Sequence, residues 1–142
     1  MNNKFFYPIS SIYIAAVLYL LITGSEILLE PLNHTPYIPL GTFLVWSGLI
    51  TLSYSVYRHF VKRSQNHPDL YAPIIGKYAG LFSLVMSLMW GFVSYKMAGN
   101  WSYNFTGNEP YRTWFIYTRV VALLPFAVIL TSLVARAARK IA

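Results

Sequence analysis

The chain has 142 residues, enough for one domain, and 56% of them are hydrophobic while only 11% are charged. Soluble domains carry about 25% charged residues, so this composition all but excludes a water-soluble globule, and 18% aromatic residues exclude a disordered segment. The absence of cysteine excludes disulfides, thiolate metal sites and thiol catalysis. The net charge of +7 falls in gaps between apolar stretches, so it indicates membrane topology, and we predict no nucleic-acid partner.

Four apolar stretches are long enough, or nearly so, to cross a hydrocarbon core of roughly 30 Å, which takes about 20 helical residues. We predict helices at about residues 8–29, 39–62, 74–97 and 112–138. No polar stripe runs along them, so lipid is the expected outer solvent. The sequence therefore predicts an all-α fold, a four-helix transmembrane bundle formed by a single integral membrane domain over residues 1–142.

The distribution of Lys and Arg predicts the orientation, because cytoplasmic flanks retain the positive excess. Eight of the eleven lie on the side of the two termini and the middle loop: Lys4, Arg58, Lys62, Arg63, Lys77, Arg136, Arg139 and Lys140. Three of the four acidic residues, Glu26, Glu30 and Glu109, lie on the other side. We predict a multi-pass protein of a bacterial inner or plasma membrane, with both termini cytoplasmic.

Two processing signals have competing interpretations. The first apolar stretch follows Lys4 like a signal peptide, but it is longer than a usual h-region and no A-x-A-like site follows, so we predict that it is retained. Three N-glycosylation sequons begin at Asn33, Asn100 and Asn104, all on the side predicted to be external. They would matter only in a eukaryotic secretory protein, and sites so close to the membrane are poor acceptors.

The third predicted helix carries a stripe of small side chains. Gly76, Gly80, Ser83, Ser87, Gly91 and Ser94 recur at spacings of 4, 3, 4, 4 and 3, which places them on one helical face. Such a face lets another backbone approach closely, the usual basis of helix association in lipid. Either the face packs within the bundle or it docks a second protein. In the second case the partner-packing residues are Gly76, Gly80, Ser83, Ser87 and Gly91.

A search for chemistry gives negative results. A transmembrane haem held by two histidines needs both at matching depth, whereas His34 lies in an outer loop and His59 and His67 lie at or beyond the opposite interface. No paired carboxylate, glycine-rich phosphate loop or nucleophile elbow is present. We therefore predict no catalytic residue, no metal site and no cofactor.

Arg119 is the one charged residue clearly within a predicted span. It lies about 10 Å in from the outer end of the fourth helix, and Glu26 lies at comparable depth in the first. An intramembrane ion pair between them would clamp these two helices. Alternatively, Arg119 extends along its long stem to the outer headgroups and needs no partner.

One segment resembles a known family. Tyr57-Arg58-His59-Phe60-Val61-Lys62-Arg63, followed by Asn66-His67-Pro68-Asp69-Leu70-Tyr71, is similar to the end of the second helix and the next loop in the small four-helix subunit IV of actinobacterial-type aa3 cytochrome c oxidases. Phe5, Tyr19, Thr23 and Gly41-Thr42 fall at similar positions. The resemblance implies an accessory bundle beside the haem- and copper-bearing subunits that contributes no redox ligand itself. We take Arg58, Lys62, Arg63 and Tyr71 as a cytoplasmic contact segment.

The sequence thus favours a non-catalytic accessory subunit of a membrane energy-transducing complex of the respiratory chain, namely a haem-copper oxidase. Its expected partners are the lipid bilayer and other membrane subunits. One alternative is a small oligomeric transporter or lipid-carrier protein, which would need a polar cavity. Another is a membrane enzyme that uses Tyr103, Asn108, Glu109 and Arg112 of the loop at 98–112.

Overall fold

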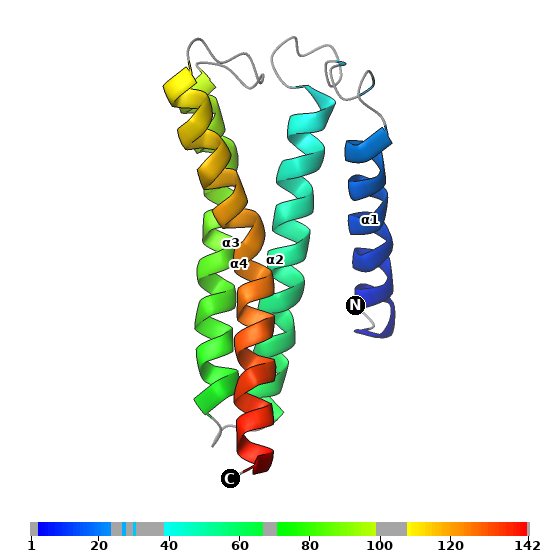
Figure 1. Cartoon of the computed structure of the whole chain (residues 1–142). Coiled ribbons are helices and arrows are strands. Elements are labelled where there is room, and N and C mark those ends of the chain that lie inside the picture. The colour runs from blue at the N-terminus through cyan, green and yellow to red at the C-terminus, as the bar shows by residue number, and fades with distance from the viewer. Residues whose placement is uncertain are drawn as a thin grey trace.

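The computed structural model describes residues 3–23, 27, 30, 39–66, 71–98 and 108–141. These residues form four helices: α1 (Asn3–Thr23), α2 (Leu40–Asn66), α3 (Tyr71–Ala98) and α4 (Asn108–Ile141) (Figure 1). The predicted all-α class is confirmed over this part of the chain. The helices α2, α3 and α4 are long and apolar enough to cross a membrane, whereas the apolar part of α1, Phe5–Leu20, is shorter.

The helices begin and end at residues that differ from the predicted ones. The first helix begins at Asn3, five residues earlier than predicted, and its described part ends at Thr23, while the second helix ends at Asn66 and not at residue 62. The peptide N–H of Glu30 donates to the carbonyl of Ile27 at 3.2 Å. The third and fourth helices begin earlier than predicted, because Pro73 and Pro110 fall in their first turns, where a missing N–H costs nothing.

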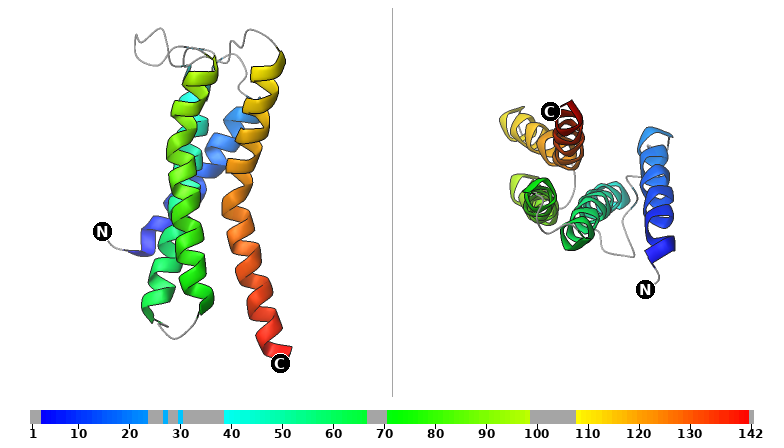
Figure 2. Two further views of the ribbon diagram at one scale, coloured as in Figure 1. Left: turned by 90° about the vertical axis from the view of Figure 1, so that its left-hand side faces the viewer. Right: turned by 90° about the horizontal axis from the view of Figure 1, so that it is seen from below.

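The helices form a three-helix core with α1 at its side. Packing is most extensive between α2 and α3, α4 packs against both, and α1 packs extensively only against α2. A view along the axes places α1 and α4 on different sides of α2 (Figure 2). The start of α1 and the end of α4 lie toward one end of the helices, which we call the terminal end (Figure 1).

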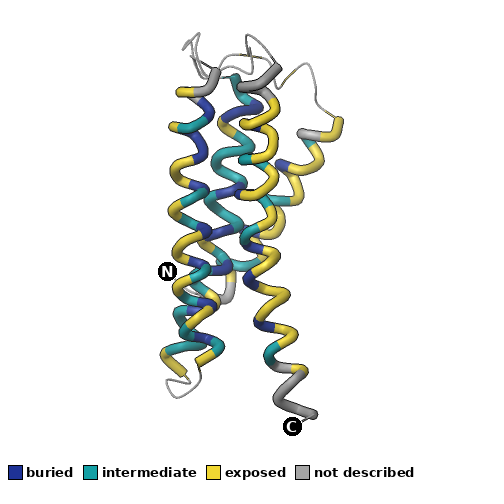
Figure 3. Tube along the Cα trace, turned by 60° about the vertical axis from the view of Figure 1, so that its left-hand side comes forward, coloured by how far each residue is buried: buried dark blue, intermediate teal, exposed yellow. Residues whose placement is uncertain are grey.

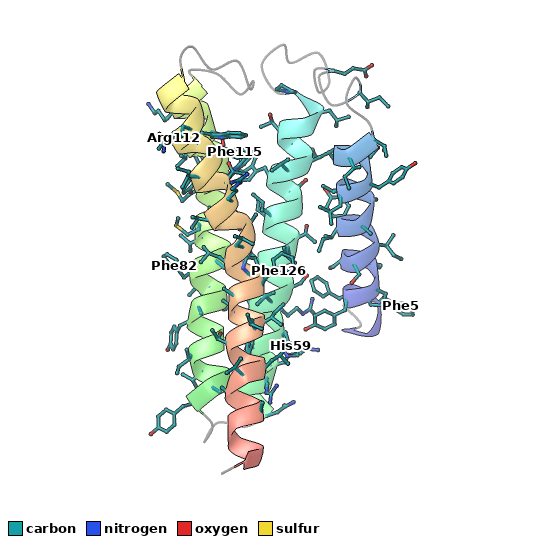
Figure 4. The ribbon with its side chains drawn as sticks, viewed as in Figure 1. Phe5, His59, Phe82, Arg112, Phe115 and Phe126 are labelled. Atoms are coloured by element: carbon teal, nitrogen blue, oxygen red, sulfur yellow. The ribbon has the colours of Figure 1, made fainter. Side chains whose placement is uncertain are left out.

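The core lies between α2, α3 and α4 in two clusters of buried side chains. Trp90 and Val121 are fully buried in the first, with Leu49 and Trp114, and Val56, Phe60 and Val128 form the second, nearer the terminal end. Buried positions face inward and exposed ones outward along each of these helices (Figure 3). Large apolar side chains such as Phe5 and Phe82 point away from the core (Figure 4). Outer faces of this kind are expected where lipid is the solvent.

Candidate functional site

The glycines of the small-residue stripe on α3 face side chains and backbone of α2. A Cβ atom on Gly91 would lie 2.6 Å from the indole of Trp46, and one on Gly80 would lie 2.9 Å from the Cα of Tyr57. At Gly76 a Cβ atom would run into the ring of Phe60. A larger residue at Gly80 would push the two helices apart because it would meet backbone, whereas one at Gly76 or Gly91 would force an aromatic ring of α2 to move.

The serines of the stripe form a hydrogen-bonded cluster with α2. The hydroxyl of Ser53 lies 3.0 Å from that of Ser83 and 2.8 Å from that of Ser87, and all three side chains are fully buried. Ser87 lies next to the carbonyl of Ser83 on its own helix, to which its hydroxyl donates at 2.9 Å. Within an apolar core such bonds hold two helices at a fixed register, because separating them would leave buried hydroxyls without partners.

The sequence left two roles open for the stripe, packing within the bundle and docking of a second protein. In the structure the stripe packs within the chain. Gly76, Gly80, Ser83, Ser87 and Gly91 are all buried against the same chain. The prediction that they pack against a partner protein is corrected accordingly. The helix that approaches the small-residue face is α2 of the same chain. A second protein would have to bind elsewhere.

Tryptophan side chains make further bonds across the core. The indole N–H of Trp46 donates to the backbone carbonyls of Ser87 and Leu88 at 3.1 and 3.2 Å. Trp90 donates to the hydroxyl of Thr118 at 2.9 Å, and Trp114 donates to the hydroxyl of Ser94 at 2.9 Å. The last two bonds connect α3 to α4. Among the described residues, no buried side-chain nitrogen or oxygen lacks a hydrogen-bond partner.

Arg119 is exposed, and its guanidinium carbon lies 4.0 Å from the ring centroid of Phe115 on the same helix. Phe115 is one turn closer to the start of α4, so the side chain extends toward that end, as expected for an arginine reaching for headgroups. Glu26 lies outside the described residues, and the proposed ion pair between the two remains a prediction.

The cytoplasmic contact segment is partly tied to α1. The guanidinium carbon of Arg58 lies 4.2 Å from the ring centroid of Phe6, which also makes an edge contact with Tyr54 at 5.7 Å. Lys62 and Arg63 are half-buried, whereas Tyr71, the first residue of α3, is 78% exposed. The basic residues and Tyr71 are therefore all at the terminal end, and Tyr71 offers the most accessible side chain.

Two further contacts attach α1 to α2. The hydroxyls of Tyr13 and Ser47 are hydrogen bonded at 2.7 Å, and Val17 packs over Gly48, where a Cβ atom would lie 3.3 Å from a Val17 methyl carbon. Together with Phe6, these residues hold one face of α1 along its length. A cavity lies on the side of α1 that faces α4.

This cavity has a volume of about 400 Å³ and lies between α1, α2 and α4. Its polar lining comprises one tyrosine, one histidine and four serines, and its apolar lining comprises isoleucine, leucine, valine and phenylalanine. The lining residues are Tyr7, Ser10, Ser11, Ile14, Leu52, Ser55, Val56, His59, Phe60, Ile129, Ser132 and Leu133. It is within the volume range of small-molecule sites, about 300–1,000 Å³. No sequence pattern indicates this cavity, because its residues come from three helices whose relative placement is a property of the fold.

Outside this cavity, the described residues give little support for a metal site or an active site. No group of three or more His, Asp or Glu side chains that could hold a metal is found among these residues. His59 lines the cavity and lies toward the same end of the helices as Phe5 (Figure 4), while His34 and His67 lie outside the described residues. Of the loop enzyme candidates, Arg112 is exposed at the start of α4. Tyr103 and the side chains of Asn108 and Glu109 lie outside the described residues.

Comparison with protein-family models, with curated proteins and with solved structures finds no match.

Proposed function

We propose that the chain is a multi-pass integral membrane protein with four spans and both termini in the cytoplasm. Three helices have the length and apolarity of spans, and α1 contributes a shorter apolar stretch. Eight of the eleven basic residues belong to the terminal end and to the sequence segments that flank it. The positive-inside rule supports the orientation in which this end is cytoplasmic.

Within that membrane we infer the role of a non-catalytic accessory subunit of an energy-transducing complex, a respiratory haem-copper oxidase. One observation carries this proposal: in the core between α2, α3 and α4, buried serine and tryptophan side chains are used in bonds between helices. These groups hold the helices together, and they are not the charged side chains that proton relays use. The resemblance of residues 57–71 to an oxidase subunit supports the choice of complex.

The partner subunit, on this proposal, binds the cytoplasmic contact segment. Because the small-residue stripe is covered by α2, the accessible candidates are Tyr71 and the basic residues Arg58, Lys62 and Arg63. Exposed tyrosine and arginine are enriched at interfaces between proteins. Basic residues at this end would also be attracted to acidic loops of a neighbouring subunit.

Purification of the tagged chain from its native membranes in mild detergent, without crosslinking, tests the role. We expect it to copurify with a larger complex that has a haem absorption spectrum, and Tyr71→Ala combined with Lys62→Gln should release the chain while its helical content is unchanged. Lys77→Gln, which removes a charge from the same end outside the contact segment, is the matched control. Isolation of the chain only as a monomer or homo-oligomer would contradict the accessory role.

A second candidate function is favoured by the cavity. A small transporter or lipid-carrier protein needs a partly polar cavity, and the space between α1, α2 and α4 combines hydroxyl groups with aliphatic walls. On this alternative the purified chain would be a homo-oligomer and would move a substrate without other subunits. The same purification therefore separates the two functions.

A further inference from the structure

The cavity between α1, α2 and α4 has a polar end and an apolar end. At the terminal end its lining includes the phenol of Tyr7 and the imidazole of His59. Two turns further along each helix, about 10 Å away, it is lined by Ile14 on α1 and Leu52 on α2, with Ile129 contributed by α4. A ligand that fits both ends must itself be amphipathic.

Two hydroxyls in the middle of the cavity point to such a ligand. The side chains of Ser10 and Ser132, on α1 and α4, are only 7% and 8% exposed. Both line the cavity, where the hydroxyl of Ser55 also lies and donates to the carbonyl of Thr51 at 2.7 Å. A hydroxyl can donate and accept hydrogen bonds, so Ser10 and Ser132 favour an occupant with oxygen atoms.

The charge around the polar end favours a negatively charged headgroup. Arg58 precedes His59 in the chain, and its guanidinium lies over Phe6, whose ring contacts Tyr7 at 5.3 Å between centroids. Lys62 follows one turn later on α2. In the sequence Asp69 is the single acid on this side of the predicted membrane, against eight basic residues. Such an excess attracts anionic lipids at the cytoplasmic surface.

We propose that this cavity binds one anionic phospholipid. Its phosphate group lies at the end formed by Tyr7 and His59, its glycerol and ester oxygens reach Ser10 and Ser132, and one acyl chain runs along the aliphatic end. The space between α1 and α4 gives access from the bilayer, because α1 packs extensively only against α2. The proposal requires the membrane setting proposed above, but it is independent of the accessory role.

Photolabelling in vesicles tests the site. The purified chain is reconstituted into phosphatidylcholine vesicles that contain a small fraction of phosphatidylglycerol with a photoreactive acyl chain, and labelled peptides are mapped after illumination. We expect the label to concentrate at residues 10–14, 52–59 and 129–133. It should fall by about tenfold when the same photoreactive chain is carried by phosphatidylcholine, which has no net charge.

Four variants test the position and the charge preference of the site. Ser10→Phe and, separately, Ser132→Phe fill the cavity and should each abolish labelling at these positions, whereas Ala127→Phe places the same ring on the exposed face of α4 and should not. Arg58→Gln with Lys62→Gln should remove the preference for phosphatidylglycerol while the acyl chain still labels the aliphatic end. Helical content and elution volume are checked for each variant. If Ser132→Phe does not fold, Ser10→Phe decides, because α1 lies outside the three-helix core.

Even labelling of all exposed helix faces would overturn the proposal. Labelling that persists in both cavity-filling variants would do so too, as would a cavity that stays unlabelled while crosslinks form to a second protein chain. Failure of the accessory role would leave this result unchanged, since the vesicles contain only this chain. Inverted membrane orientation would appear separately, in cysteine labelling of the loops.

Discussion

Gly80 of α3 and Tyr57 of α2 meet backbone to backbone, so that a Cβ atom on Gly80 would lie 2.9 Å from the Cα and 3.2 Å from the amide nitrogen of Tyr57. Neither main-chain atom can rotate away, as the end of a flexible side chain could. The helices α2 and α3, which pack most extensively, can therefore come this close only because Gly80 has no Cβ atom.

Replacing Gly80 with Ala should destabilise the chain by about 1–3 kcal/mol, because the helices must move apart. Gly48→Ala is the matched control: its new methyl would meet only a Val17 side chain at 3.3 Å, and alanine improves helix propensity by about 1 kcal/mol. Unfolding in mixed detergent micelles, followed by circular dichroism, measures both. Equal effects of the two substitutions would contradict the close contact at Tyr57.

The serine cluster should be worth a measurable coupling energy. Ser53→Ala removes two interhelical contacts at once, and interhelical hydrogen bonds in membrane proteins average about 0.6 kcal/mol, up to about 1.7. A double-mutant cycle with Ser87→Ala should give a coupling of about 0.6 kcal/mol. Ser55→Ala, whose hydroxyl bonds only to its own helix, should change stability less. Strict additivity of Ser53→Ala and Ser87→Ala would show that this bond contributes nothing.

The bond from Trp90 to Thr118 should show an asymmetry between its partners. Thr118→Val leaves the fully buried indole N–H without an acceptor, which costs about 1–3 kcal/mol. The same substitution in a Trp90→Phe background should be nearly neutral, because no donor then remains. Thr131→Val, at an exposed threonine that bonds to its own helix, is the control. Thermal unfolding of the four proteins of this cycle and of the control in detergent gives the comparison, and an equal cost of Thr118→Val in both backgrounds would exclude the bond.

We expect Arg119 and Glu26 to contribute independently to the stability of the protein. The guanidinium lies over Phe115 toward the start of α4, so Arg119→Leu and Glu26→Gln should have effects that add within about 0.3–0.5 kcal/mol. A non-additive double substitution would instead establish the ion pair between the first and fourth helices. Stability measurements in detergent and in bilayer discs distinguish these outcomes.

The existence of the helices follows from the apolar stretches, since an uninterrupted run of this length has few other solutions in lipid. Their ends were harder to predict: Pro73 and Pro110 resemble helix breakers, yet a first turn has no need of the missing N–H. The spacing of Gly76, Gly80 and Gly91 identified a close-packing face correctly. Periodicity cannot say which helix fills that face, and here it is α2 of the same chain.

The cavity could not be predicted, because it depends on how far α1 stands from α4. Its four serines are scattered at positions 10, 11, 55 and 132, and each alone is typical of a membrane helix whose hydroxyl bonds to its own backbone. Only their convergence, with Tyr7 and His59, distinguishes a site. The bond from Trp90 to Thr118 likewise has no sequence signal, because the two residues lie on different helices.

The central claim, four spans with both termini in the cytoplasm, is tested most directly by labelling single cysteines in intact cells with a membrane-impermeant reagent. Cysteines at Gln65 and Ala142 should be protected, one at Gly107 should be labelled, and one at Asn2 decides whether the short apolar helix α1 crosses. We predict that the Asn2 cysteine is protected and becomes reactive only after the cells are opened. Labelling of Asn2 in intact cells, with Gln65 and Ala142 protected, would contradict the account, because α1 would then lie outside and the chain would have three spans.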